Sequence, residues 1–337
     1  MEVVAHHAHQ TVRVVEASQP SAVRATARAL ADRAGFQETD SYRVGIVATE
    51  LATNVVKHST GGEVLVRAAA DGIGELELIA IDRGPGIADV AAALADGQST
   101  TGSNGTGLGA IRRLSDEFDI YSGSRGTIVL ARIRAGRAAT QREPFAIAGI
   151  SVAKSGETEC GDAWAVQRRP ESVVALIADG IGHGHDAAAA AGAALEALHA
   201  GSYRDCASAL EGVHGGLRHT RGAAAAIFEL DWSKRVVKFA GVGNVSGVLL
   251  GQGDVRRQTV SHNGTLGHQA THFREYSYPW DRQGLLVMHS DGLVSHWSLD
   301  SYPGLRLRHP AIVAGVLYRD FNRGRDDVTV VVGREQA

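Results

Sequence analysis

This sequence has few cysteines and a small net charge. Its 337 residues contain two cysteines, Cys160 and Cys206, without metal-type spacing, and the formal net charge is −3. Two such cysteines do not build a disulfide framework, so a reducing cytoplasm is the expected compartment. A charge this small gives no reason to expect nucleic acid or an anionic membrane surface as the main partner.

Long apolar runs are also missing. None approaches the roughly 20 residues that a membrane-spanning helix needs, and the first residues, MEVVAHHAHQ, lack the charged-then-apolar pattern of a signal peptide. We therefore expect no membrane partner, and we interpret His6, His7 and His9 as part of an exposed terminus. What is present, 44% hydrophobic and 21% charged residues, is typical of a globular chain long enough for two domains.

The apolar pattern divides the chain into two halves that meet at residues 134–145, a short polar stretch rich in arginine and alanine. In the first half, helical spacing is found at 21–35, 41–59 and 107–118, and strand character at 62–70, 74–84 and 126–133. Ser41 is the expected N-cap of the second helix. The second half is mostly strands, interrupted by an alanine-rich helix over 186–200.

The segment ELATNVVKH carries the first candidate site. Glu50 and Asn54 are four residues apart, so both lie on one face of the second helix, with Lys57 one turn further on. An asparagine there can ligate Mg²⁺ through its carbonyl oxygen, and a glutamate can orient or deprotonate a nucleophile.

Two glycine-rich segments complete this site. In IAIDRGPGI, Asp82 ends a strand where it can accept a hydrogen bond from an adenine amino group, and Gly84 and Gly86 let the backbone approach the base. In GTGLG a helix begins, whose amide groups and dipole favour phosphate. This second segment consists of Gly105, Thr106, Gly107, Leu108 and Gly109. It is neither a Walker loop nor a good Rossmann fingerprint.

The order of these segments resembles the GHKL ATPases, with an N box and two glycine boxes. Within that family it is most similar to the RsbW- and RsbT-like serine/threonine kinases, which act as anti-sigma and stressosome switch factors. The resemblance covers residues 10–133 and implies a Bergerat-type α/β sandwich that binds ATP and Mg²⁺. By it, Asn54 holds Mg²⁺, Glu50 is the catalytic carboxylate and Asp82 binds adenine, and the other residues of the three boxes bind the nucleotide.

A different chemistry is expected in the second half, where acids recur at the points where strands meet turns. They are Asp162 in CGDAW, Asp179 in IADGIG, Asp291 in MHSDGL, and Asp326 with Asp327 in GRDDVTVVV. Clustered carboxylate oxygens suit Mg²⁺ or Mn²⁺. Two such ions about 3.5–4 Å apart can share a water, lower its pKa and aim it at phosphorus.

This set resembles the PPM family of metal-dependent Ser/Thr protein phosphatases, in its SpoIIE/RsbX-like branch, over residues 146–335. The resemblance implies an αββα sandwich in which Asp179 bridges two metal ions and Gly180 ligates one through its carbonyl. Asp291 and Asp326 then hold the other ion, with Asp162 close by. Relatives outside this branch place a candidate proton donor, a histidine, directly after the Asp-Gly pair. Ile181 occupies that position here. His183 lies nearby and could serve as the donor, but we interpret it as a structural residue and His185 as exposed polarity at a helix start, so the leaving-group acid stays open.

Together these patterns predict an α+β chain with three parts: an ATP-binding serine/threonine kinase domain at 1–133, a linker at 134–145 and a phosphatase domain at 146–337. The two resemblances imply ATP with Mg²⁺ in the first domain and two Mn²⁺ or Mg²⁺ in the second. They imply as partner a STAS-domain anti-sigma antagonist or stressosome scaffold, with a sigma factor or a downstream phosphatase as further partners. Two alternatives stay open: a first domain that only binds ATP or sequesters a regulator, and a phosphatase for small molecules.

Overall fold

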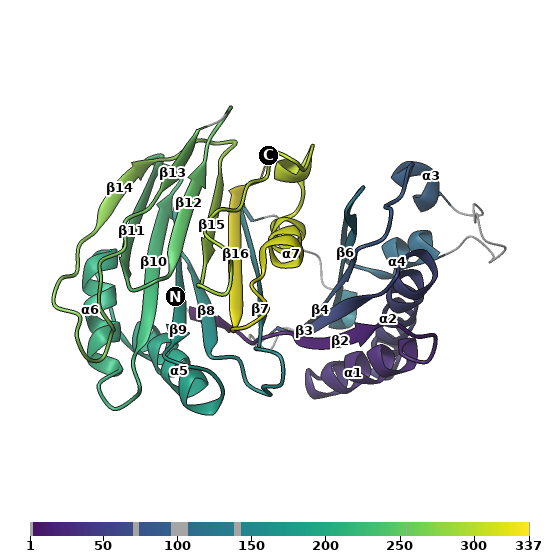
Figure 1. The fold of residues 1–337 in the computed structure, drawn as a ribbon, viewed down its shortest axis with the longest axis horizontal. Helices are drawn as coiled ribbons and strands as arrows, with labels where there is room; N and C mark the ends of the chain where they lie inside the picture. Colours follow the sequence, from purple (N-terminus) through teal and green to yellow (C-terminus); the bar gives the residue numbers. More distant parts are fainter. Residues whose placement is uncertain (1–2, 70–73, 96–106, 138–142, 254, 337) are drawn as a thin grey trace. The chain divides into compact units, whose positions relative to one another are not determined.

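The computed structural model describes residues 3–69, 74–95, 107–137, 143–253 and 255–336. The chain forms two compact units (Figure 1). The N-terminal unit comprises His9–Gln141 and Ser298–Val316; the C-terminal unit comprises Met1–Ala8, Arg142–Trp297 and Leu317–Ala337. The division near residue 141 lies within the expected linker. Two segments, however, belong to the unit at the other end of the chain, which the sequence pattern did not indicate.

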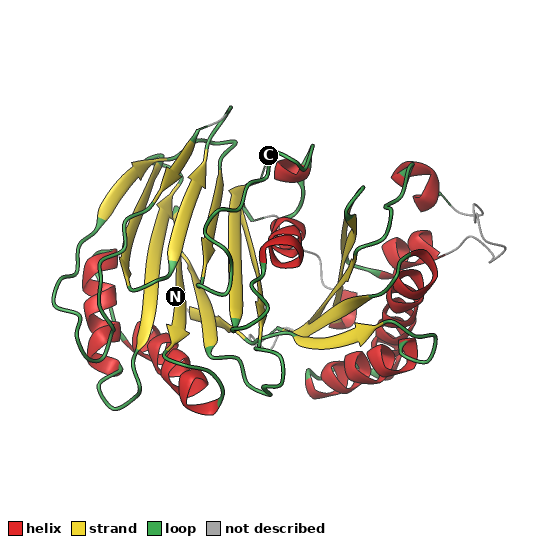
Figure 2. Cartoon of the chain, viewed as in Figure 1, coloured by secondary structure: helices red, strands yellow, loops and turns green. Residues whose placement is uncertain are grey.

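The N-terminal unit is built on one antiparallel sheet with helices on one face (Figure 2). Its strand order is β2 (Gln10–Val14), β3 (Gly62–Ala68), β4 (Glu75–Asp82), β6 (Gly126–Arg134) and β5 (Glu117–Gly123). Its helices are α1 (Pro20–Arg33), α2 (Glu38–His58), α3 (Val90–Leu94) and α4 (Gly107–Leu114). Apolar residues at helical spacing, such as Val23, Ala27 and Ala31 of α1, are fully buried in a core shared with the sheet.

Helix α2 begins earlier than predicted. Its N-cap is Gln37, whose extended backbone (ψ 161°) precedes Glu38 and Asp40 in the first turn, where acids favour the helix dipole. Ser41 is therefore not the cap. It lies inside the helix, is buried, and donates a hydrogen bond from Oγ to Oδ1 of Asp32 at 3.1 Å. This bond ties the start of α2 to the end of α1.

The second face of this sheet is buried as well. Leu65, Ile79, Ile128 and Leu130 are completely buried although they alternate with residues that face the helices. Residues 298–316 belong to this unit and are joined by hydrogen bonds to β5 and to the turn that follows it. The amide of His309 donates to Oδ2 of Asp119 at 2.7 Å, and Nη1 of Arg125 donates to the hydroxyl of Tyr302 at 2.9 Å.

A buried ion network lies on the same sheet. Oε1 of Glu77 accepts hydrogen bonds from Nη2 of Arg67 at 2.6 Å and pairs with Nε2 of His9 at 3.0 Å, and Oε2 accepts from Nε of Arg132 at 2.7 Å. Burial alone would raise the pKa of Glu77, but the guanidinium groups of Arg67 and Arg132 hold it well below its usual range. His9 is 5% exposed, so its predicted place in an exposed terminus is wrong.

The C-terminal unit contains two antiparallel sheets that pack face to face. The first has the order β1 (Val3–His6), β8 (Asp162–Arg168), β9 (Ser172–Gly180), β10 (Ala223–Asp231), β11 (Val236–Val242) and β14 (Tyr276–Pro279). The second has the order β13 (Arg256–Gln258), β12 (Ser246–Leu250), β15 (Leu285–His289), β16 (Val328–Glu335) and β7 (Phe145–Val152). Helices α5 (His185–Ala200) and α6 (Cys206–Gly216) cover the outer face of the first sheet (Figure 2).

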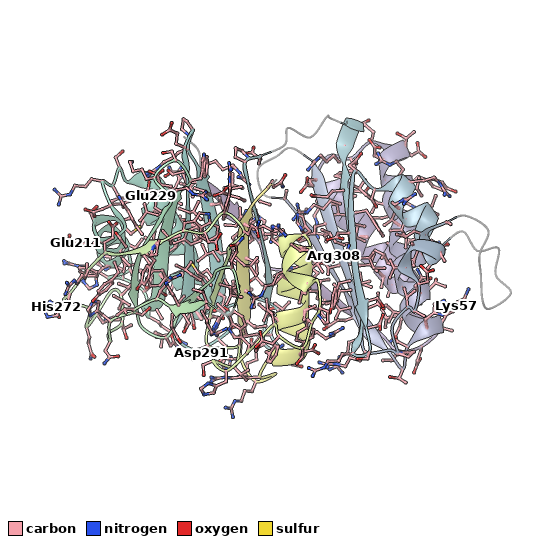
Figure 3. All side chains as sticks on the ribbon, turned by 90° about the horizontal axis from the view of Figure 1, so that it is seen from above. Lys57, Glu211, Glu229, His272, Asp291 and Arg308 are labelled. Carbon is pink, nitrogen blue, oxygen red and sulfur yellow. The ribbon has the colours of Figure 1, made fainter. Side chains whose placement is uncertain are left out.

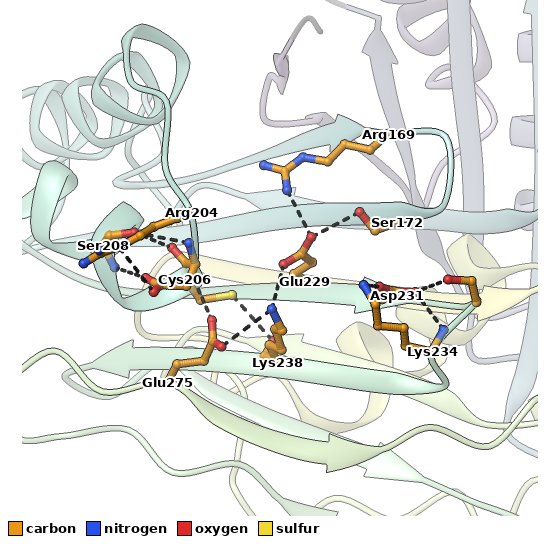
Figure 4. Close-up of polar contacts among 12 residues, drawn as sticks. Arg169, Ser172, Arg204, Cys206, Ser208, Glu229, Asp231, Lys234, Lys238 and Glu275 are labelled. Atoms are coloured by element: carbon orange, nitrogen blue, oxygen red, sulfur yellow. Dashed lines mark hydrogen bonds and ion pairs between the residues drawn. The ribbon is translucent and has the colours of Figure 1, made fainter.

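Polar contacts fix the beginning of α6 to the first sheet (Figure 4). Asp205 and Ser208 form a capping box, and the amide of Cys206 donates to Oε2 of Glu275 at 2.7 Å. Lys238 lies within ion-pair distance of both Glu275 and Glu229. Both cysteines of the chain are free and buried, and burial raises the pKa of each thiol well above its usual value. Such thiols are poor nucleophiles.

The first residues of the chain form a strand rather than an exposed tail. In β1, Val3 to His6 pair antiparallel with Gln167 to Trp164 of β8, and the ring of His6 stacks on that of Trp164 at 3.8 Å. The sequence pattern missed this strand because it has only four residues, all partly exposed. No helix within the described ranges is both long and apolar enough to cross a bilayer.

Deleting residues 1–8 is expected to destabilise the C-terminal unit. The deletion removes four cross-strand pairs, which at about 0.2–1 kcal/mol each amount to about 1–4 kcal/mol. Differential scanning calorimetry should show a lower Tm for the corresponding transition. A Tm equal to that of the full chain would contradict a structural role for β1.

Candidate active sites

The first candidate site lies between α2 and the start of α4. Glu50 and Asn54 lie on the same face of α2, and a Cβ placed on Gly107 would be 3.2 Å from Oε2 of Glu50 and 3.4 Å from Oδ1 of Asn54. The sequence pattern placed these three residues in one site, and the fold brings them together. Nδ2 of Asn54 is buried and has no hydrogen-bond partner within the described residues. A buried, unpaired amide normally has a ligand or water as its partner, so this position suits a bound Mg²⁺–nucleotide.

Asp82 is held in place by the backbone around it. Its Oδ1 accepts hydrogen bonds from the amides of Gly84 at 2.7 Å and Thr127 at 3.1 Å. Gly84 has no room for a side chain, because a Cβ would lie 2.7 Å from the carbonyl oxygen of His58. Gly86 has a φ of +82°, which favours glycine. Two backbone amides therefore fix the carboxylate of Asp82 at the end of its strand.

For the other described residues that were predicted to bind the nucleotide, the structure gives a position on a helix. Leu108 and Gly109 lie in the first turn of α4, and Lys57 is exposed in the last turn of α2 (Figure 3). Gly105 and Thr106 lie outside the described residues. Beside Glu50, a surface hollow is lined by residues of α1 and α2, including Arg24, Arg28 and Tyr42.

The second candidate site gathers the acids of the C-terminal unit. Asp162 begins β8 and is the direct cross-strand partner of Asp179 near the end of β9; such partners have Cβ atoms about 4.5–5.5 Å apart. Asp291 follows β15 and Asp326 precedes β16, and these two strands are neighbours. Oγ of Ser290, which follows β15, donates to Oδ2 of Asp162 at 2.6 Å. This bond joins the ends of the two sheets.

Glycines next to these acids let the segments approach each other. A Cβ on Gly161 would lie 2.7 Å from Oδ2 of Asp327, and one on Gly180 would collide with the carbonyl of Ala187. A Cβ on Gly292 would collide with the carbonyl of Asp327. The glycines that accompany the acids in the sequence are thus required by close packing of the backbone.

The acids strongly perturb one another. Burial, and then the charges of Asp162, Asp291, Asp326 and Asp327, raise the pKa of Asp179 to about 9. Burial also raises the pKa of Asp162 to about 7, although the hydrogen bond from Ser290 acts to lower it. Carboxylates that repel one another in this way ionise together only beside cations, so the donor set fits hard divalent ions. In the described part of the chain, no three acidic, His or Cys side chains already converge on one point as a finished ion site.

Two contributions to this site were missed by sequence reasoning. Nδ2 of Asn244, in the turn between β11 and β12, donates to Oδ2 of Asp291 at 2.6 Å. Oδ1 of Asp327 accepts from the amide of Lys154 at 2.8 Å. The segment GVGNV, with a polar residue between two apolar strands, is the signal that could have identified Asn244.

Comparison with known proteins identifies the two halves. Residues 15–133 match the family model of the histidine kinase-like ATPase domain, and residues 169–334 match that of stage II sporulation protein E (SpoIIE). The serine/threonine-protein kinase RsbT of Bacillus subtilis (strain 168) is 37% identical over 112 residues, which are 33% of this chain and 84% of RsbT. The chain joins a histidine kinase-like ATPase domain of the RsbT family to a SpoIIE-family phosphatase domain.

Further relatives agree with this division. The phosphoserine phosphatase RsbX of B. subtilis (strain 168) is 23% identical over 140 residues, 42% of this chain and 70% of RsbX. A structure from the bacterial stressosome, described as a modular system adapted to control secondary messenger signaling, is 29% identical with a TM-score of 0.53 and covers 57% of this chain and all of its own. RsbX in complex with magnesium has a TM-score of 0.51 at 20% identity, over 59% of this chain and 99% of its own. The predicted fold class, with an ATPase-like and a PPM-type domain, is confirmed.

Proposed function

We propose that this chain is a signalling switch whose two domains act in opposite directions on one partner. The kinase domain transfers phosphate from ATP to a serine or threonine of a STAS-domain protein, either an anti-sigma antagonist or a stressosome scaffold. The phosphatase domain removes it. The meeting of Asp162, Asp179, Asp291 and Asp326 at one end of the two sheets is the observation that carries this proposal. The relatives RsbT, RsbX and the stressosome structure support the choice of partner.

In the kinase reaction, the residues of the first site position the reactants. Asn54 would hold Mg²⁺, Asp82 would hold adenine, and the amides at the start of α4 would face the phosphates. Glu50 would orient the partner's hydroxyl and accept its proton. Phosphoryl transfer needs little more than positioning and charge neutralisation. Because ATP is the donor, the reaction belongs in the cytoplasm.

In the phosphatase reaction, Asp179 and the carbonyl of Gly180 would hold two Mn²⁺ or Mg²⁺ together with Asp291 and Asp326. Bound there, the ions would supply a water of lowered pKa and a positive charge for the phosphate oxygens. Asp162 lies opposite Asp179 and is fixed by Ser290, so it would orient that water from the side of β8. Asn244 would keep Asp291 in position through its hydrogen bond.

Labelled ATP tests both activities at once. The full chain is incubated with γ-labelled ATP, Mg²⁺, Mn²⁺ and a candidate STAS-domain protein of the same genome, beside the Asp179→Asn variant. We expect label to accumulate on the partner with Asp179→Asn and to remain low with the wild type. If ATP binds but neither form labels the partner, the first domain is a sensor or sequestering module for that protein instead.

A further inference from the structure

The phosphatase reaction needs a proton that none of the residues assigned above can give. When the phosphorus–oxygen bond of phosphoserine breaks, the electron pair stays on the serine oxygen, which is a poor leaving group unless it is protonated. Carboxylates that hold metal ions must be ionised, so they supply no proton. A positioned general acid typically contributes about 10²–10⁴-fold to such a step. The acid should therefore lie beside the metal cluster without belonging to it.

The turn after Asp179 holds a histidine against a glutamate. Nδ1 of His183 lies 2.6 Å from Oε1 of Glu157. Gly182 and Gly184, on either side of the histidine, have positive φ values of +93° and +73°, and a Cβ on Gly184 would be 3.0 Å from Oε2 of Glu157. A side chain at Gly184 would push the glutamate away, so the glycines shape the turn around this pair.

Glu157 comes from a loop that is itself attached to the acids. The loop between β7 and β8 donates the amide of Lys154 to Asp327 and ends at Gly161, whose carbonyl accepts the amide of Gly180 at 2.9 Å. The His183–Glu157 pair therefore connects the two segments that border Asp179 and Asp162. The side chain of His183 is 46% exposed, which leaves its ring accessible to a substrate.

We propose that His183 is the general acid of the phosphatase and that Glu157 is its positioning residue; the inference rests on the proposed phosphatase function. The carboxylate of Glu157 can only accept a hydrogen bond, so Nδ1 of His183 is the donor of this pair. Nε2 is left free for the substrate, and in the imidazolium form it carries the second proton. The water oxygen bonds to phosphorus and releases one proton to solvent, the bond to the serine oxygen breaks, and that oxygen takes the proton from Nε2. The neutral imidazole regains its proton from solvent.

The chain provides a matched control in the next histidine. Nδ1 of His185 pairs with Oε2 of Glu159 at 3.0 Å, from the same two segments. The side chain of His185 is 81% exposed, however, and it lies in the first turn of α5, two residues further from Asp179. Loss of this second pair removes a surface contact of the same chemistry without removing the proposed acid.

The test compares leaving groups in the full-length protein with Mn²⁺. For His183→Gln, kcat/KM on a phosphoserine peptide should fall about a hundredfold or more, whereas that on p-nitrophenyl phosphate, whose leaving group needs no proton, should fall only a few-fold. Glu157→Gln should also lower the ratio of kcat/KM on the peptide to kcat/KM on p-nitrophenyl phosphate, and His185→Gln should leave this ratio unchanged. The rise in Tm caused by Mn²⁺ should be equal in His183→Gln and the wild type, because His183 does not bind the ions.

Equal losses on both esters, or a reduced Tm response to Mn²⁺, would assign His183 to metal binding or turn structure and overturn its role as an acid. No loss on the peptide would do the same. A wild type that hydrolyses neither ester would instead overturn the proposed phosphatase function, and the role of His183 with it.

Discussion

Replacing Glu77 with glutamine is expected to lower the free energy of unfolding by about 3–5 kcal/mol. The substitution leaves Arg67 and Arg132 buried without the carboxylate that both contact. Removing one partner of a buried ion network has this cost because the remaining charge stays out of water. Urea unfolding followed by circular dichroism measures it. Glu16→Gln, at an exposed position outside the helices of the same unit, is the matched control and should change stability by less than about 0.5 kcal/mol.

The pH dependence of this difference identifies its cause. The pKa of Glu77 is depressed in the folded protein, so its stabilising effect is present above the unfolded value of about 4.3 and is lost as the pH falls towards the folded value. The difference in free energy of unfolding between the wild type and Glu77→Gln should therefore be constant near neutral pH and become smaller below about pH 4. A gap that does not depend on pH would point to packing rather than to charge.

Asp179→Asn is expected to reduce the release of phosphate from a phosphoserine peptide by about a thousandfold. An amide cannot bridge two cations as a carboxylate does, and metal stabilisation of the transition state is worth several kcal/mol. Colorimetric phosphate release with Mn²⁺ in excess measures the loss. The variant should keep its fold, and its own Tm in chelator should be no lower than that of the wild type, because Asp179 is repelled by four other acids.

Asp300→Asn is the control for this experiment, since that carboxylate is exposed in the N-terminal unit. Its phosphatase rate should equal that of the wild type. A rate within tenfold of the wild type for Asp179→Asn would mean that Asp179 does not bridge the ions.

The sequence predicted which residues gather at the two candidate sites better than it predicted where the helices and strands begin and end. Glu50 and Asn54 share a helix face by their spacing alone, and Asp162 and Asp179 each stand beside a glycine where a strand meets a turn. The limits of helices were harder, as at Ser41, because an acid-rich first turn after an extended residue started α2 earlier. The segment GVGNV marks Asn244 as a polar turn residue, but its contact with Asp291, like that of Glu157 with His183, depends on which loops the sheets bring together.

Residues 1–8 and 298–316 each belong to the unit at the other end of the chain, and the sequence pattern missed this for a different reason. β1 has only four residues, and its partner strand follows the whole kinase domain. The sequence analysis assigned residues 298–316 to the phosphatase domain, because the phosphatase resemblance extends across them. They are held at Asp119 and Arg125 by hydrogen bonds between residues far apart in the sequence, which periodicity cannot predict.

The pairing of β1 also imposes an order on biosynthesis. The first strand to leave the ribosome has no partner until β8 has been made. At about 5–20 residues per second, the interval between these two strands lasts roughly 8–30 s. The backbone N–H and C=O groups of β1 stay unpaired throughout that time, so nascent chains of this protein should depend on ribosome-associated chaperones more than a separately encoded phosphatase does.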